Sequence, residues 1–228
     1  MSGRRFAAAG LALLACLGAG ATAARGAAAA DSGRQIAARG LASGVPACGS
    51  CHGAAGEGLA VQQAPRLAGL DAGYLAEQLD RFASGARKND VMASVAKALT
   101  LDERRAVAAY FARLPTPSLT PHPAAQSDLA RGQALAERGD WAANVPACGA
   151  CHGPEGRGVG AVTPPLSGQS QAYLSAQLAA FRTGARRSDT LGLMNGIAAR
   201  LSPADLQAAA AYYASLPAGA PARTGAGR

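Results

Sequence analysis

Apolar side chains recur at helical spacing along most of this chain, which predicts an all-α protein. In the first half, Tyr74, Leu75, Leu79 and Phe82 fall on one face of a helix over residues 72–84. The same pattern returns over about residues 170–183. Alanine and leucine dominate the composition and aromatic residues make up only 4% of it, which also favours helices.

Capping residues mark where these helices begin and end. A polar residue that can accept from a free backbone N–H starts a helix, and a glycine commonly stops one. The predicted starts are Asp71 for residues 72–84, Thr100 with Glu103 for 101–114, and Ser202 with Asp205 for 203–216, and the predicted stops include Gly85 and Gly184. A short helix is also expected near the start of each half, before residues 48 and 148. Each half would then pack three helices around its core.

A five-residue motif occurs twice, at Cys48-Gly49-Ser50-Cys51-His52 and at Cys148-Gly149-Ala150-Cys151-His152. C-x-x-C-H is the spacing of covalent haem attachment. Two thioethers must reach two vinyl groups on one porphyrin edge while the adjacent histidine turns under the ring. The alternatives are one zinc site shared by both pairs or a redox-active dithiol, but neither explains the two histidines.

The two halves also match each other beyond the motif. At an offset of 99 or, after a three-residue insertion, 102, the following residues pair: Pro65 with Pro164, Leu67 with Leu166, Tyr74 with Tyr173, Gln78 with Gln177, Phe82 with Phe181, Arg87 with Arg186, Met92 with Met194, and Tyr110 with Tyr212. Apart from Met1, the chain has no other methionine. We therefore interpret Met92 and Met194 as distal haem ligands rather than core fillers, and we expect them in the loops 86–98 and 185–200.

The N-terminus reads as a secretory leader. A basic start containing Arg4 and Arg5 precedes an apolar run, and Ala21-Thr22-Ala23 resembles a cleavage site. Export to the periplasm is expected, with cleavage between about residues 23 and 30. Cys16 loosely resembles a lipidation box, so peripheral membrane association stays open as an alternative.

Charge excludes one class of partner. The chain has 22 basic and 14 acidic residues; loss of three arginines with the leader leaves 19 basic residues and a net charge of about +5. This surplus is divided evenly between the halves, unlike the concentrated basic face of a nucleic-acid-binding protein. We expect no nucleic-acid partner.

The predicted organisation is a leader over residues 1–30, domains over 31–115 and 128–218, a proline-rich linker over 116–127, and a flexible tail over 219–228. His122 lies within the linker and has no counterpart in the other half.

Each half resembles a class I cytochrome c domain, and the tandem resembles the cytochrome c4 family of dihaem carriers. The resemblance rests on Val-Pro-Ala-Cys-Gly-x-Cys-His-Gly in both halves, a Pro-x-Leu-x-Gly segment and the methionines. It implies two haem c groups. Cys48, Cys51, Cys148 and Cys151 would attach them, and His52, Met92, His152 and Met194 would ligate iron. A carbonyl near Pro65 or Pro164 would orient each imidazole.

The implied function is single-electron transfer, without catalysis, from a quinol-oxidising complex to a terminal oxidase. An alternative is the haem-bearing subunit of a periplasmic dehydrogenase that acts on a sulfur compound or an alcohol. A dihaem peroxidase would need one openable iron site, which paired methionines oppose. A structural disulfide protein would be colourless.

Overall fold

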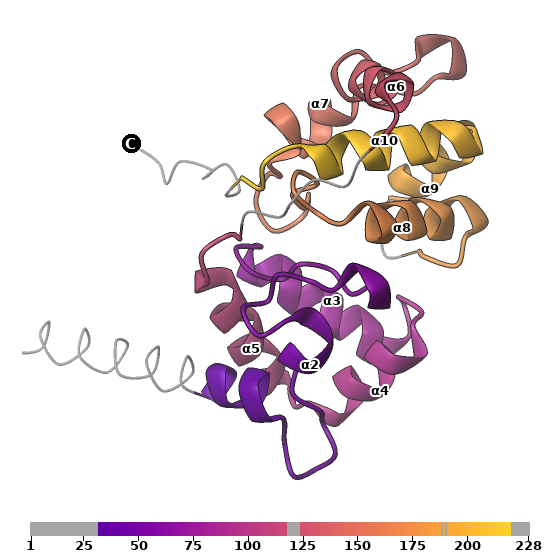
Figure 1. Cartoon of the computed structure of the whole chain (residues 1–228). Coiled ribbons are helices and arrows are strands. Elements are labelled where there is room, and N and C mark those ends of the chain that lie inside the picture. The colour runs from indigo at the N-terminus through magenta and orange to yellow at the C-terminus, as the bar shows by residue number, and fades with distance from the viewer. Residues whose placement is uncertain (1–31, 118–123, 188, 190, 220–228) are drawn as a thin grey trace, which may run out of the picture.

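The structure, a computed structural model, describes residues 32–117, 124–187, 189 and 191–219. The predicted leader, half of the predicted linker including His122, and nearly all of the predicted tail lie outside these residues. Two helical domains lie side by side (Figure 1), and β structure within the described ranges is limited to isolated bridges. The all-α prediction is confirmed.

The two domains repeat one order of α-helices, while their short 3-10 helices differ in position. The first domain contains a helix over residues 32–39, α2 (Gly49–His52), η1 (Ala60–Gln62), α3 (Ala72–Ser84), α4 (Asp90–Ala98) and α5 (Leu101–Arg113). The second contains α6 (Gln126–Glu137), η2 (Trp141–Ala143), α7 (Cys148–His152), η3 (Pro154–Gly156), α8 (Gln171–Thr183), α9 (Leu193–Arg200) and α10 (Pro203–Ser215). Because α6 begins at Gln126, its first turn takes up the end of the predicted linker.

The predicted caps are present. The side chain of Asp71 accepts from Tyr74 N at 2.9 Å, and Gly85 ends α3 in the left-handed region at φ 80°. Both predicted capping boxes, Thr100 with Glu103 and Ser202 with Asp205, form reciprocally. These local signals placed the first residue of all three helices because each satisfies backbone donors that the helix itself leaves free.

The prediction that residues 86–98 and 185–200 are loops is wrong. Residues 90–98 form α4, and residues 193–200 form α9. The side chain of Asn89 caps α4 by accepting from Met92 N at 2.9 Å. Each domain therefore has a further helix, which packs against α3 in the first domain and against α8 in the second.

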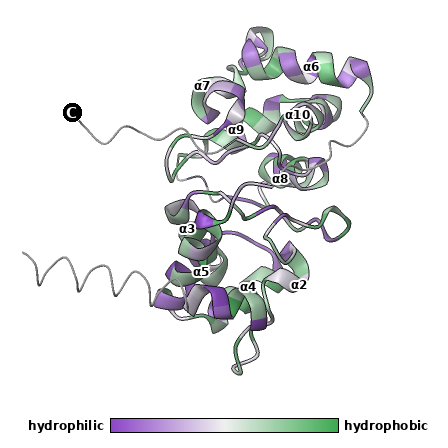
Figure 2. Ribbon diagram, turned by 60° about the vertical axis from the view of Figure 1, so that its left-hand side comes forward, coloured by the Kyte–Doolittle hydropathy of each residue, from purple (hydrophilic) through white to green (hydrophobic). Residues whose placement is uncertain are grey.

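Each domain has its own apolar core. In the first, α3 and α5 bury Leu75 and Phe111; in the second, α8 and α10 bury Leu174 and Tyr213. Figure 2 shows hydrophobic and hydrophilic residues mixed along the helices, as expected of amphipathic helices with one face buried.

In both domains the N-terminal helix crosses the C-terminal helix at a glycine. A Cβ added to Gly33 would lie 2.2 Å from the Ala106 carbonyl oxygen, and one added to Gly132 would lie 2.2 Å from that of Ala208. The helices approach so closely that only a glycine fits at the crossing.

We predict that Gly132→Ala lowers the free energy of unfolding of the second domain by about 1–3 kcal/mol, because α6 must move away from the backbone of α10. Thermal unfolding of the holoprotein measures this. Gly196→Ala in α9 is the matched control, since its Cβ would meet only the end of the Arg200 side chain at 3.4 Å. Equal unfolding temperatures for Gly132→Ala and wild type would contradict the close crossing.

A second prediction concerns acid stability. Arg131 on α6 binds Asp140 at 2.8 Å and Asp205 on α10 at 2.6 Å, and its hydrogen bonds hold the pKa of both carboxyl groups below their usual range. The ion pairs therefore stabilise the fold above about pH 4, the unfolded aspartate pKa, and are lost as pH falls through the lowered folded values.

Arg131→Gln should accordingly be slightly less stable than wild type at pH 7, because exposed ion pairs contribute little to the free energy of unfolding. Urea unfolding at a series of pH values measures the difference, which should shrink below about pH 4. A difference that is constant with pH would show that the ion pairs are not its source.

Candidate functional site

The two Cys-x-x-Cys-His motifs form the short helices α2 and α7. Each places its histidine in the last turn, and a glycine with positive φ, Gly53 at 81° and Gly153 at 76°, ends the helix directly afterwards. His52 and His152 are each only 8% exposed. The motif thus presents one buried imidazole beside two thiols in each domain.

A proline carbonyl orients each imidazole. Nδ1 of His52 lies 2.9 Å from the Pro65 carbonyl oxygen, and Nδ1 of His152 lies 2.9 Å from that of Pro164. Because a carbonyl can only accept, Nδ1 carries the proton and Nε2 is left with its lone pair. Burial lowers the pKa of both histidines, which favours the neutral form that binds a metal. The orienting carbonyls implied by the family resemblance are therefore present in both domains.

The cysteines suit covalent attachment better than zinc binding or thiol exchange. All four are free thiols, and burial raises the pKa of Cys48 to about 11 and also raises that of Cys148. A reactive dithiol or a zinc ligand requires a thiolate. Across the described ranges, no group of three or more histidine, cysteine or acidic side chains is placed to hold a metal ion, as a zinc site shared by both motifs would require.

The surroundings of the motifs are apolar, as a porphyrin requires. Cys48 and Leu67 pack against the core cluster of the first domain, and Cys148 and Leu166 pack against the corresponding cluster of the second. Free thiols, a neutral imidazole and an apolar wall together fit a covalently bound haem in each domain.

Met92 and Met194 lie in the first turns of α4 and α9, and both are partly buried. An acceptor side chain holds the backbone at each position. Met92 N donates to Asn89 Oδ1, and Met194 N donates to the carboxylate of Asp189. The two methionines therefore occupy equivalent, anchored positions in the two domains.

A reciprocal network of arginines joins the two domains, and the sequence motifs gave no indication of it. Arg87 donates to Gln78 of its own domain at 2.9 Å and to Gln177 of the other at 2.8 Å. Arg186 donates to Gln177 at 2.8 Å and to Gln78 at 3.2 Å, and the two arginines also form an antiparallel backbone bridge. Because Arg87 and Arg186 occupy equivalent positions in the repeat and pair with each other, the two domains are related by a local twofold axis that passes between these residues.

Each of these guanidinium groups also lies 4.5 Å above an aromatic ring of its own domain, Arg87 over Phe82 and Arg186 over Phe181. Stacking on a ring favours a cation in a partly buried site. These arginines, glutamines and phenylalanines are equivalent positions of the sequence repeat. Similarity between the halves does not reveal, however, that the arginine of one half contacts the glutamine of the other.

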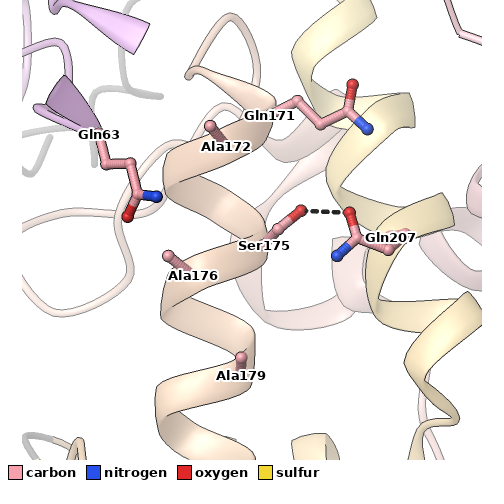
Figure 3. A pocket seen from close by; sticks show the side chains of 7 residues that line it. All are labelled: Gln63, Gln171, Ala172, Ser175, Ala176, Ala179 and Gln207. Carbon is pink, nitrogen blue, oxygen red and sulfur yellow. Dashed lines mark hydrogen bonds between the residues drawn. The ribbon is translucent and has the colours of Figure 1, made fainter. Parts of the chain in front are cut away.

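An open groove is lined mainly by residues of α8 and also by Gln63 of the first domain and Gln207 of α10 (Figure 3). Small and amide side chains line it, with a hydrogen bond of 2.8 Å from Ser175 to Gln207. None of its lining residues is ionisable, so the groove offers no acid–base chemistry, and the motif histidines do not line it.

Comparison with known proteins agrees with this geometry. The cytochrome c family model matches residues 30–115 and 129–217. A thiosulfate dehydrogenase electron acceptor of Stutzerimonas stutzeri is 48% identical over 75% of this chain and 79% of its own, and one of Thiomonas intermedia is 46% identical over 75% and 78%. Cytochrome c4 of Pseudomonas aeruginosa is 36% identical over 74% and 83%.

Two solved structures extend the comparison. Thiosulfate dehydrogenase TsdBA of Marichromatium purpuratum superposes with a TM-score of 0.78 and 45% identity over 82% of this chain, which spans 40% of that longer chain. Reduced cytochrome c4 of Pseudomonas stutzeri gives a TM-score of 0.69 and 29% identity over 82% of this chain and 98% of its own.

Fold, motifs and comparisons together define a c-type cytochrome. The chain belongs to the cytochrome c family, as a tandem of two domains of the cytochrome c4 kind. It is an electron carrier rather than a catalytic enzyme. No helix in the described part of the chain has the length and apolar character needed to span a bilayer.

Proposed function

We propose that this chain is a periplasmic dihaem cytochrome that accepts electrons from a thiosulfate dehydrogenase and passes them to a further redox protein. The observation that carries the proposal is the duplicated pocket, in which a buried histidine oriented by a proline carbonyl recurs beside two thiols. The similarity to two proteins named thiosulfate dehydrogenase electron acceptor supports this donor.

The residues divide the work in each domain. The thiols of Cys48 and Cys51 hold the first haem, and those of Cys148 and Cys151 hold the second. His52 and His152 bind iron through Nε2, because the Pro65 and Pro164 carbonyls take the Nδ1 proton. When bound, each haem supplies a one-electron ferric/ferrous couple.

Met92 and Met194 fill the distal positions in this proposal. A thioether ligand favours ferrous iron and raises the reduction potential. If a histidine and a methionine of each domain held the haem iron, no place would remain there for oxygen, peroxide or thiosulfate, and substrate chemistry would stay with the dehydrogenase. Two one-electron sites let one chain take both electrons of a two-electron oxidation.

The similarity to proteins named cytochrome c4 favours a second candidate. In that reading the donor is a quinol-oxidising complex and the acceptor a terminal oxidase, as the family resemblance implied. The two candidates share every residue role and differ only in the donor.

The ligand assignment predicts that Met92→Ala and Met194→Ala each convert one haem from low-spin to a high-spin or water-ligated form. The weak far-red band of ferric methionine-ligated haem should halve in each single variant and vanish in the double variant, as measured by optical spectroscopy of the ferric protein. Ser94→Ala, an exposed change on the same helix as Met92, should leave the band intact. A full band in either methionine variant would refute its assignment.

The donor assignment predicts that oxidised holoprotein is reduced by thiosulfate only when a thiosulfate dehydrogenase is added in catalytic amount. The enzyme of Stutzerimonas stutzeri is a suitable probe, and the reduced c-type band should grow to two electrons per chain under anaerobic conditions. Thiosulfate alone is the control and should give no reduction. Failure with the dehydrogenase, together with rapid reduction by a quinol-oxidising complex, would establish the second candidate instead.

A further inference from the structure

Arg66 is a fully buried cation at the contact between the domains. Its exposed fraction is 0%, and burial lowers its pKa to about 10, so it remains charged at neutral pH. All three guanidinium nitrogens donate to backbone carbonyl oxygens: Nη1 to Ala68 at 2.6 Å, Nη2 to Ser167 at 3.3 Å and Nε to Gly168 at 3.3 Å. No carboxylate of the described residues forms an ion pair with it.

The acceptors of Arg66 place its charge near the local twofold axis. Ala68 and Ser167 occupy the same position in the two halves, and the guanidinium donates to both. A group that binds equivalent atoms of both domains lies between them, in the same interface as the bridge of Arg87 with Arg186. Arg66 also directly follows Pro65, and Ser167 lies three residues beyond Pro164, so the charge adjoins both histidine-orienting loops.

The second half departs from the repeat at two places that match this arrangement. Pro165 stands at the position equivalent to Arg66, and a second cation there would compete for the same buried space. Gln169 stands where the first half has Leu70. Its side-chain amide binds the Arg66 backbone at both ends, accepting from Arg66 N at 2.9 Å and donating to Arg66 O at 3.1 Å. The reverse clasp cannot form, because leucine has no amide and Pro165 has no N–H.

We infer that the single charge of Arg66 raises the reduction potentials of both haems together. Gln169 is the positioning residue, because its side chain fixes where that charge lies. The inference rests on the proposed dihaem function. Reduction takes one electron from a donor and lowers the positive charge of a haem iron by one. A fixed cation in a low-dielectric interface therefore favours the ferrous form, and one near the axis acts on both pockets.

The test compares Arg66→Met with Gln169→Leu in the full dihaem protein. Redox titration followed optically, with proton NMR to resolve the two haems, gives each potential, and native-state hydrogen exchange reports domain contact. Arg66→Met should shift the ferric/ferrous ratio of both haems about tenfold toward ferric at a given potential, a fall of about 59 mV each. Gln169→Leu keeps the charge, so it should accelerate exchange at the interface while changing each ratio less than twofold.

Two further variants complete the comparison. Arg105→Met removes an arginine whose side chain is 63% exposed and should change neither potential nor exchange. If Arg66→Met fails to accumulate as a dihaem protein, Arg66→Gln, which is neutral but can still bind carbonyls, should give the same shift.

Three results would overturn the inference. Unchanged potentials in the neutral variants would make Arg66 a structural clamp alone. A shift confined to the haem of His52 would refute the placement near the axis. Equal shifts in Arg66→Met and Gln169→Leu would assign the effect to domain contact rather than charge. Wild-type protein without two methionine-ligated haems would instead refute the proposed function, before any variant is compared.

Discussion

A buried imidazole must have its Nδ1 proton accepted, and in each domain a single proline carbonyl meets this requirement. The acceptors lie 13 residues after His52 and 12 after His152, so each loop must leave the motif helix and return to it. Backbone bonds close the turn: Gly58 N donates to His52 O and Gly158 N to His152 O, both at 2.7 Å. The loop that supplies the carbonyl also returns Leu67 and Leu166 to the apolar wall, so the orientation of the imidazole and one wall of the pocket depend on the same segment.

The interface between the domains combines a symmetric part and an asymmetric part. The arginine and glutamine network forms twice, because each glutamine contact of Arg87 has a counterpart at Arg186. Arg66 and Gln169 bind each other across the interface, and neither has a counterpart in the other half, where Pro165 and Leu70 stand. The duplicated contacts set the relative orientation of the domains, while the unique pair gives the two halves different roles at one shared point.

Much of the fold could be predicted from the sequence because its signals are local. Asp71, Thr100 and Ser202 mark helix starts through bonds made within one turn, and the motif histidines are set by spacing alone. Helix α4 lies in a segment predicted as a loop, although Met92, Val95, Ala96 and Leu99 follow a helical period. The prediction placed the distal methionine in a loop so that its sulfur could reach the iron. The contacts of Arg66 with the second domain could not be predicted, since they join residues more than 100 positions apart.

The clasp of Gln169 on Arg66 also determines which domains can pair. Two first domains brought together in the same way would bury two Arg66 guanidinium groups at one point, with no carboxylate between them. Two second domains would meet with neither the cation nor the backbone N–H that Gln169 requires. Only a first domain paired with a second domain completes the contact, so this interface distinguishes the two kinds of domain although they share one fold.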